Sequence, residues 1–134
     1  VFSRGNRNAS VNFVETDFGF EDSYKKSEEI LAYRPSAVIC ATDGLAVGIM
    51  RALHENGVAV PGEVSVVGFG GYELGAVTYP PLTTVAFDYE ALGRRASKML
   101  LKILAGEVVE SVSDFPAQLI ERGSVGKVLW GSEG

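Results

Sequence analysis

The spacing of apolar residues predicts a chain in which helices alternate with short strands. Apolar positions recur with the period of a helix in residues 21–33, 45–53 and, most strongly, 92–103. Runs rich in β-branched residues separate these segments and predict strands; they cover residues 11–15, 37–41, 64–69, 82–86 and 117–121. The runs at 37–41 and 64–69 are apolar without alternation, which is typical of strands buried on both faces.

Capping and turn residues mark the ends of the predicted helices. Thr42 and Asp43 offer side-chain oxygens that can cap the second helix, and Asp88 offers one to the third. Gly57 and Gly106 follow the last apolar positions of these two helices, where glycine commonly ends a helix. Alternating elements with short connections favour parallel βαβ units. The expected fold class is therefore α/β, a three-layer arrangement with helices on both faces of a parallel sheet.

Composition and charge fit one soluble globular domain. The chain has 134 residues, of which 46% are hydrophobic and 22% charged, and its net charge is -5. A negative charge gives no overall attraction to nucleic acid, and the basic side chains of the third helix are spaced like one solvated face: Arg94, Arg95, Lys98 and Lys102. No apolar run approaches the roughly 20 residues that span a bilayer. We therefore expect a cytoplasmic protein without a membrane partner.

The residues of a hydrolytic or metal site are scarce. His54 is the single histidine, and near the end of the second helix it fits a helix-end charge partner or a surface residue. Cys40 is the single cysteine and lies in an apolar run, as a buried small hydrophobe does. A structural zinc site usually needs four Cys or His ligands, and the chain has only these two, so a zinc site is excluded. The dinucleotide-binding motif Gly-x-Gly-x-x-Gly is also absent after Gly68 and Gly70, because Glu73 stands where the motif needs its last glycine. We expect no enzyme, no metal and no cofactor.

Ligands in open α/β sheets bind outside the carboxyl ends of the strands. Three segments directly follow predicted strands, at residues 17–20, 42–43 and 70–73. These segments combine aromatic rings, hydroxyls and carboxylates with flexible glycines. This is the chemistry of a carbohydrate site, because rings stack on the apolar face of a sugar and polar groups bond its hydroxyls. The candidate ligand-binding residues are Asp17, Phe18, Phe20, Thr42, Asp43, Gly70, Gly71, Tyr72 and Glu73.

Four blocks of sequence, in this order, carry a resemblance to a known family. The blocks are ATDGLAVGIMRAL at 41–53, VAVPGEVSVVGF at 58–69, PPLTTV at 80–85 and LGRRA at 92–96. Together they resemble the effector domain of the LacI/GalR family of bacterial transcriptional repressors over nearly all of residues 11–123. The likeness is specific because several unrelated strings occur in register.

The resemblance implies a periplasmic-binding-protein-like fold of two α/β lobes with a sugar in the cleft between them. By this likeness residues 1–134 are the C-terminal part of the effector domain, and 11–87 form mainly its C-terminal lobe. Residues 88–112 are then a crossover helix and connection that pack on an N-terminal lobe, and 113–134 are a return strand and tail. The likeness also implies a homodimer that contacts operator DNA only through a headpiece absent from this chain.

The resemblance assigns roles to some of the candidate residues. Phe18 lies where the family often places an aromatic ring against the ligand, and a core plug is the alternative. Thr42 and Asp43 occupy a pair at the cleft, while Asp43 alternatively acts only as a helix cap. The chain departs from the family at Gly70, where many members carry an aspartate that bonds sugar hydroxyls.

One variant segment, GFGGYE at 68–73, together with Phe87-Asp88-Tyr89, resembles the branch of sucrose and trehalose operon repressors. The ligand is then a disaccharide or its phosphate, with Tyr72 or Glu73 making polar contacts; simple packing of Tyr72 is the alternative. A sugar-binding protein of an ABC-type transporter is the second candidate, and an enzyme of flavodoxin-like or Rossmann architecture is the third. An upstream helix-turn-helix, rather than a signal peptide, would favour the repressor over the transporter component.

Overall fold

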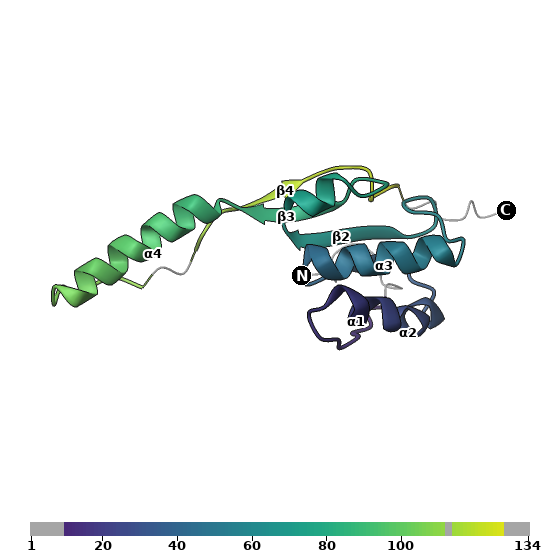
Figure 1. Cartoon of the computed structure of the whole chain (residues 1–134), viewed down its shortest axis with the longest axis horizontal. Coiled ribbons are helices and arrows are strands. Elements are labelled where there is room, and N and C mark those ends of the chain that lie inside the picture. Colours follow the sequence, from purple (N-terminus) through teal and green to yellow (C-terminus); the bar gives the residue numbers. More distant parts are fainter. Residues whose placement is uncertain (1–9, 112–113, 128–134) are drawn as a thin grey trace.

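A mostly parallel sheet organises the chain. The computed structural model describes residues 10–111 and 114–127. Its elements, in chain order, are α1 (Phe20–Lys25), α2 (Ser27–Ala32), β1 (Ala37–Ile39), α3 (Asp43–Glu55), β2 (Ser65–Gly70), the 3-10 helix η2 (Glu73–Ala76), β3 (Thr83–Phe87), α4 (Tyr89–Leu104) and β4 (Ala117–Ile120). The strands lie in the order β1-β2-β3-β4; the first two pairs are parallel and β3 pairs with β4 antiparallel. The mixed α/β class expected from the sequence is confirmed (Figure 1).

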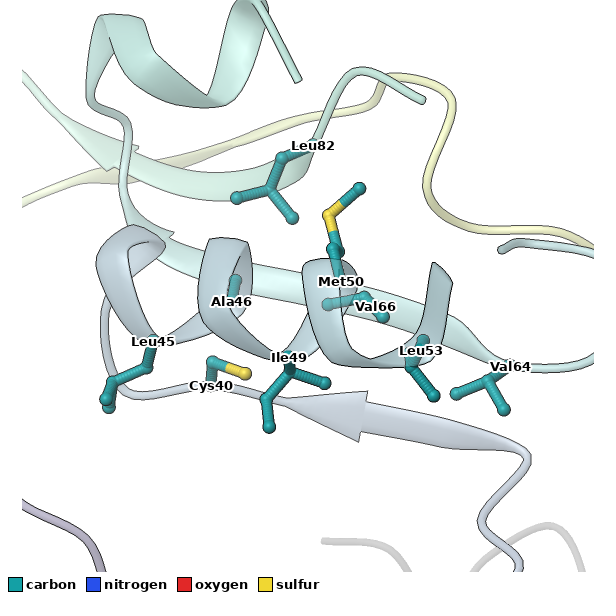
Figure 2. Close-up of a cluster of buried hydrophobic side chains, with 9 residues drawn as sticks. All are labelled: Cys40, Leu45, Ala46, Ile49, Met50, Leu53, Val64, Val66 and Leu82. Carbon is teal, nitrogen blue, oxygen red and sulfur yellow. The ribbon is translucent and has the colours of Figure 1, made fainter. Parts of the chain in front are cut away.

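The core forms around α3, which packs on β2. Figure 2 shows Met50 extending towards Leu82 on one side of α3, while Leu45, Ile49 and Leu53 point the other way. The whole cluster consists of Cys40, Leu45, Ala46, Ile49, Met50, Leu53, Val64, Val66 and Leu82. Burial raises the pKa of the Cys40 thiol to about 12, and the Asp43 carboxylate adds to the shift. Cys40 is thus the buried hydrophobe that the sequence predicts.

The predicted boundaries of the two long helices are confirmed. Thr42 caps α3, because its hydroxyl oxygen accepts the Leu45 N–H at 3.2 Å, and Asp43 is the first helical residue rather than the cap. Asp88 caps α4, and one of its carboxylate oxygens accepts the Ala91 N–H at 2.8 Å. Gly57, with φ of 72°, and Gly106, with φ of 79°, follow the two helices.

The strand predicted at residues 11–15 is wrong. These residues have no regular secondary structure, although their polar and apolar positions alternate. A strand needs a neighbour to pair its backbone groups, and the described sheet ends at β1 without pairing to this segment. The helix predicted at 21–33 is divided into α1 and α2 at Lys26, whose backbone stays in the right-handed helical region (φ -82°, ψ -1°).

One face of the sheet carries exposed apolar side chains, contrary to the prediction that 37–41 is fully buried. Ile39 is 70% exposed, because within the described residues no helix covers this face of the sheet. The register places Ile39 beside Val67, and Phe69 beside Val85, so these side chains share one face. Within the described residues α3 is the helix that packs on the sheet, and the second helical layer stays a prediction.

Helix α4 projects from the rest of the chain (Figure 1). None of its residues is buried, and its large apolar side chains are open to solvent: Leu92, Leu100, Leu101, Ile103 and Leu104. Its basic side chains are exposed as well, as expected for a solvated face. In the described parts of the chain, no helix has both the length and the apolar character needed to cross a bilayer.

Candidate functional site

The carboxylate of Asp43 joins three segments at the carboxyl ends of the strands. Asp43 is fully buried at the first position of α3. Its Oδ2 accepts the backbone N–H of Tyr72 at 2.7 Å, and its Oδ1 accepts the hydroxyl of Thr84 at 2.5 Å. The positive end of the α3 dipole also favours a negative charge at this position. Asp43 therefore connects α3 to β3 and to the loop that follows β2.

That loop turns through two glycines against β3. Gly70 has φ of 131° and Gly71 has φ of 73°, which are conformations that side chains rarely adopt. The N–H of Gly71 donates to Oγ1 of Thr84 at 3.3 Å. A Cβ on Gly71 would lie 2.3 Å from Cβ of Ala86, so a side chain at this position cannot be accommodated without movement. The two glycines fix where Tyr72 leaves the strand.

Two tyrosines lie in parallel at this edge. Tyr72 follows β2 and Tyr89 begins α4, and about half of each side chain is exposed. Their rings are stacked with the planes 7° apart. Burial raises the pKa of the Tyr89 phenol above its usual value, and the Tyr72 phenol and the Asp43 carboxylate raise it further. The Tyr89 phenol therefore stays protonated at neutral pH and can donate or accept a hydrogen bond.

Thr42 and Glu73 differ in what they offer to a ligand. The hydroxyl oxygen of Thr42 accepts the Leu45 N–H, and the side chain is half-buried. Its hydroxyl also carries a hydrogen that can donate a hydrogen bond. Glu73 is exposed at the start of η2. In the chain, Thr42 precedes Asp43 and Glu73 follows Tyr72, the two residues that are joined by a hydrogen bond.

The segment before α1 is placed differently from the sequence-based expectation. Phe18 is 78% exposed, which makes a core plug wrong. Phe20 lies against α3, with the guanidinium of Arg51 5.9 Å from the centre of its ring. Asp17 lines an open depression with charged side chains of α1 and α2. Among the described residues, no hydrogen bond or aromatic contact links Asp17 or Phe18 to the group around Asp43.

Sequence reasoning missed three residues of this edge. Tyr89 and Phe87 lie at the carboxyl end of β3, and the rule that singled out the ends of the other strands applies to them equally. Thr84 could not be found in this way. It lies within a strand and 41 positions from Asp43, so only the folded chain brings its hydroxyl to that carboxylate.

The chemistry of the edge is that of binding. Its groups are a half-buried hydroxyl and open aromatic surface, while its buried carboxylate and the N–H groups of Gly71 and Tyr72 are already bonded within the fold. Within residues 10–111 and 114–127, no three His, Cys, Asp or Glu side chains are grouped so as to hold a metal ion. Such a surface suits an uncharged ligand with both apolar and hydroxyl-bearing faces.

Comparison with known proteins defines the class. The model of the family described as periplasmic binding protein-like domain matches residues 3–125. A lactose operon repressor of Rhizobium radiobacter is 32% identical over 109 residues, which are 80% of this chain and 96% of that protein. The chain belongs to the LacI/GalR family of transcriptional regulators and corresponds to its periplasmic binding protein-like domain.

Solved structures of the family extend the comparison. A lac repressor dimer bound to operator and the anti-inducer ONPF superposes with a TM-score of 0.77 at 31% identity, covering 83% of this chain and 40% of that one. A LacI family regulator of Arthrobacter sp. FB24 in complex with lactose superposes with a TM-score of 0.78 at 26% identity, covering 89% and 46%. The chain also spans only between 28% and 38% of the longer curated repressors that it matches.

Proposed function

We propose that this chain is the effector-sensing part of a sugar-responsive transcriptional repressor. The sugar binds at the carboxyl ends of the strands, and a headpiece outside the chain binds operator DNA. The protein acts as a homodimer in the cytoplasm, without a membrane partner and without catalysis. Family membership supports this proposal, as does a solved relative that is a dimer bound to operator.

The proposal also assigns the residues of this chain to the two lobes of the effector domain. Residues 11–87 form mainly the C-terminal lobe, 88–112 cross to the N-terminal lobe, and 113–134 return; 112–113 and 128–134 lie outside the described residues. The apolar side chains of α4 and of the open sheet face support this layout, because surfaces of that kind are normally covered. The remainder of the effector domain then packs on both surfaces.

The observation that carries the proposed site is the convergence of Thr42, Gly71, Tyr72 and Tyr89 where parallel strands end. Asp43 acts in this site as a positioning residue, because both of its oxygens are engaged within the fold. Phe18 adds an exposed aromatic ring from the segment before α1. Glu73 lies beside Tyr72 and is available to sugar hydroxyls.

Sugar binding regulates the repressor if the sugar has a different affinity for the DNA-binding and DNA-released states. The effector is a disaccharide of the sucrose or trehalose type, as the segment GFGGYE at 68–73 suggests. The second candidate, a transporter component, is less favoured because the curated relatives are repressors.

Titration calorimetry on the intact protein tests the site. Wild-type protein is expected to bind trehalose or sucrose, and Phe18→Ala is expected to weaken that binding about tenfold, since an exposed ring that stacks on the sugar is lost. Phe13→Ala is the matched control, because Phe13 is 89% exposed and outside the proposed site. Unchanged affinity in Phe18→Ala removes Phe18 from the site, and a wild-type protein that binds no sugar contradicts the proposed function.

A further inference from the structure

Tyr89, the first residue of α4, packs against two other aromatic side chains. Its ring lies parallel to that of Tyr72, with the planes 7° apart and the centroids separated by 6.2 Å. The ring of Phe87 meets Tyr89 edge-on at a centroid distance of 6.2 Å. Both arrangements are those in which aromatic rings attract each other. Tyr89 thereby joins α4 to the loop after β2 and to the end of β3.

The remainder of α4 projects away from the sheet, and none of its residues is buried (Figure 1). Within the described residues, the hydrogen bonds and the ion pair of α4 lie inside the helix or link it to the residues at its two ends. The connection that returns from α4 to β4 has no regular secondary structure in its described part, residues 107–111 and 114–116. The direction of α4 is therefore decided near its first turn.

A single residue, Asp88, separates β3 from α4. The end of β3 is held on both sides, since the strand pairs with β2 and with β4 up to its last two residues. Rotation about the backbone of Asp88 therefore turns α4 relative to the sheet, as residues at the ends of elements do in hinged proteins. Such a rotation separates the ring of Tyr89 from that of Tyr72.

The Tyr72 ring is a fixed partner for Tyr89. The backbone N–H of Tyr72 donates to the buried carboxylate of Asp43 at 2.7 Å. A Cβ on Gly70 would lie 2.8 Å from Cε2 of Tyr72, so the ring lies directly against the backbone of Gly70. Because these contacts tie Tyr72 to α3 and β2, the distance between the two tyrosine rings depends on the direction of α4.

We propose that Tyr72 and Tyr89 form a latch, in which stacking of the two rings holds the first turn of α4 against the loop after β2. When the rings separate, α4 turns about Asp88. An aromatic pair changes an equilibrium constant by a factor of about 2 to 10 beyond the effect of burial. A contribution of this size shifts the balance between two conformations without abolishing either, which suits a regulatory contact.

The regulatory consequence rests on the proposed function. There, the remainder of the effector domain packs on the apolar side chains of α4, so the direction of α4 sets how that remainder is placed relative to this lobe. The latch then favours one of the DNA-binding and DNA-released states, and opening it changes operator affinity in the absence of any sugar. The stacking itself needs neither sugar nor DNA.

A double-mutant cycle on the intact protein tests the stacking. Tyr72→Ala, Tyr89→Ala and the double variant are compared by equilibrium urea unfolding. The unfolding equilibrium constant is expected to show a coupling of about two- to tenfold between the two substitutions. Tyr33→Ala combined with Tyr89→Ala is the matched control, because Tyr33 is 47% exposed and Tyr89 is 48% exposed, but Tyr33 lies at the end of α2. The control pair is expected to be additive, and additive effects of Tyr72→Ala and Tyr89→Ala overturn the latch.

The distance between two spin labels tests the direction of α4. The labels are attached through Lys98→Cys on α4 and His54→Cys on α3, two exposed positions. The native Cys40 is not labelled, because burial raises the pKa of its thiol to about 12 and keeps it from reagent. Labelled subunits are diluted with unlabelled protein, so that the distance within one subunit is measured.

One distance population is expected while the latch is intact, and a second one is expected in Tyr72→Ala and in Tyr89→Ala. Tyr72→Phe and Tyr89→Phe keep the rings and should keep the single population. If the Ala variants give the wild-type distribution, the direction of α4 does not depend on the latch and the inference is wrong. A second population in the Phe variants shows that the phenol groups, and not the stacked rings, hold α4, which also overturns it.

Operator affinity without sugar tests the regulatory consequence. Fluorescence anisotropy is expected to give a dissociation constant that Tyr89→Ala changes by about two- to tenfold and that Tyr33→Ala leaves unchanged. An unchanged constant in Tyr89→Ala overturns the regulatory role, even where the cycle shows coupling. A protein that binds no DNA or no sugar contradicts the proposed function, whereas the cycle and the label distances still decide whether the latch exists.

Discussion

Asp43→Ala is expected to lower the free energy of unfolding by about 2–6 kcal/mol, because it leaves one buried and one partly buried donor without a partner, at about 1–3 kcal/mol each. The donors are the N–H of Tyr72 and the hydroxyl of Thr84. Substitution also removes a carboxylate from the amino-terminal end of α3. Equilibrium urea unfolding followed by circular dichroism measures the change.

Asp88→Ala is the matched control for this variant. Asp88 also accepts a backbone N–H with its carboxylate, at 2.8 Å, but it caps α4 in an exposed position. Its loss is expected to cost about 1 kcal/mol. The structural role given to Asp43 is wrong if Asp43→Ala destabilises the protein no more than Asp88→Ala does.

Gly71→Ala is expected to destabilise the protein by about 2–5 kcal/mol. Left-handed backbone costs a residue with a side chain about 1–2 kcal/mol, and forcing extra atoms into a packed site costs about 1–3 kcal/mol. Both terms apply to Gly71, which has φ of 73° and whose added Cβ would lie 2.3 Å from Cβ of Ala86. The same urea titration measures the effect.

Gly57→Ala separates the two causes. Gly57 has nearly the same φ, 72°, but a Cβ added there meets nothing within 4 Å. This variant should therefore show only the backbone cost. Adding Ala86→Gly to Gly71→Ala should recover part of the lost stability, because it removes the nearest clashing atom. Equal destabilisation by Gly71→Ala and Gly57→Ala would show that the contact with β3 has no energetic weight.

Elements with strong local signals could be predicted from the sequence. The apolar stripe of α3, its cap at Thr42 and Gly57 beyond its end all lie within one short stretch, and the same holds for α4. The segment at 11–15 shows the limit of such reasoning. Its alternation is that of a strand, but pairing depends on a neighbour that local pattern does not specify.

The candidate site was predicted in part. The rule that ligands bind at the ends of parallel strands drew attention to Thr42, Gly71 and Tyr72, which the structure places at one edge of the sheet; that they bind a ligand stays a prediction. The contacts of Asp43 were not foreseeable, since an acid at the start of a helix has the same local pattern whether it binds a ligand or a distant hydroxyl. The contact of the Phe20 ring with Arg51, which follows it by 31 positions, was not foreseeable for the same reason.

The central claim is that sugar binding to this domain controls DNA binding. Fluorescence anisotropy of the intact protein with labelled DNA from upstream of its own gene, titrated with trehalose, sucrose or lactose, tests it most directly. One of these sugars is expected to change operator affinity over the same concentration range in which calorimetry detects its binding. A sugar that binds at this site and leaves operator affinity unchanged, or a protein that binds no DNA, would contradict the account.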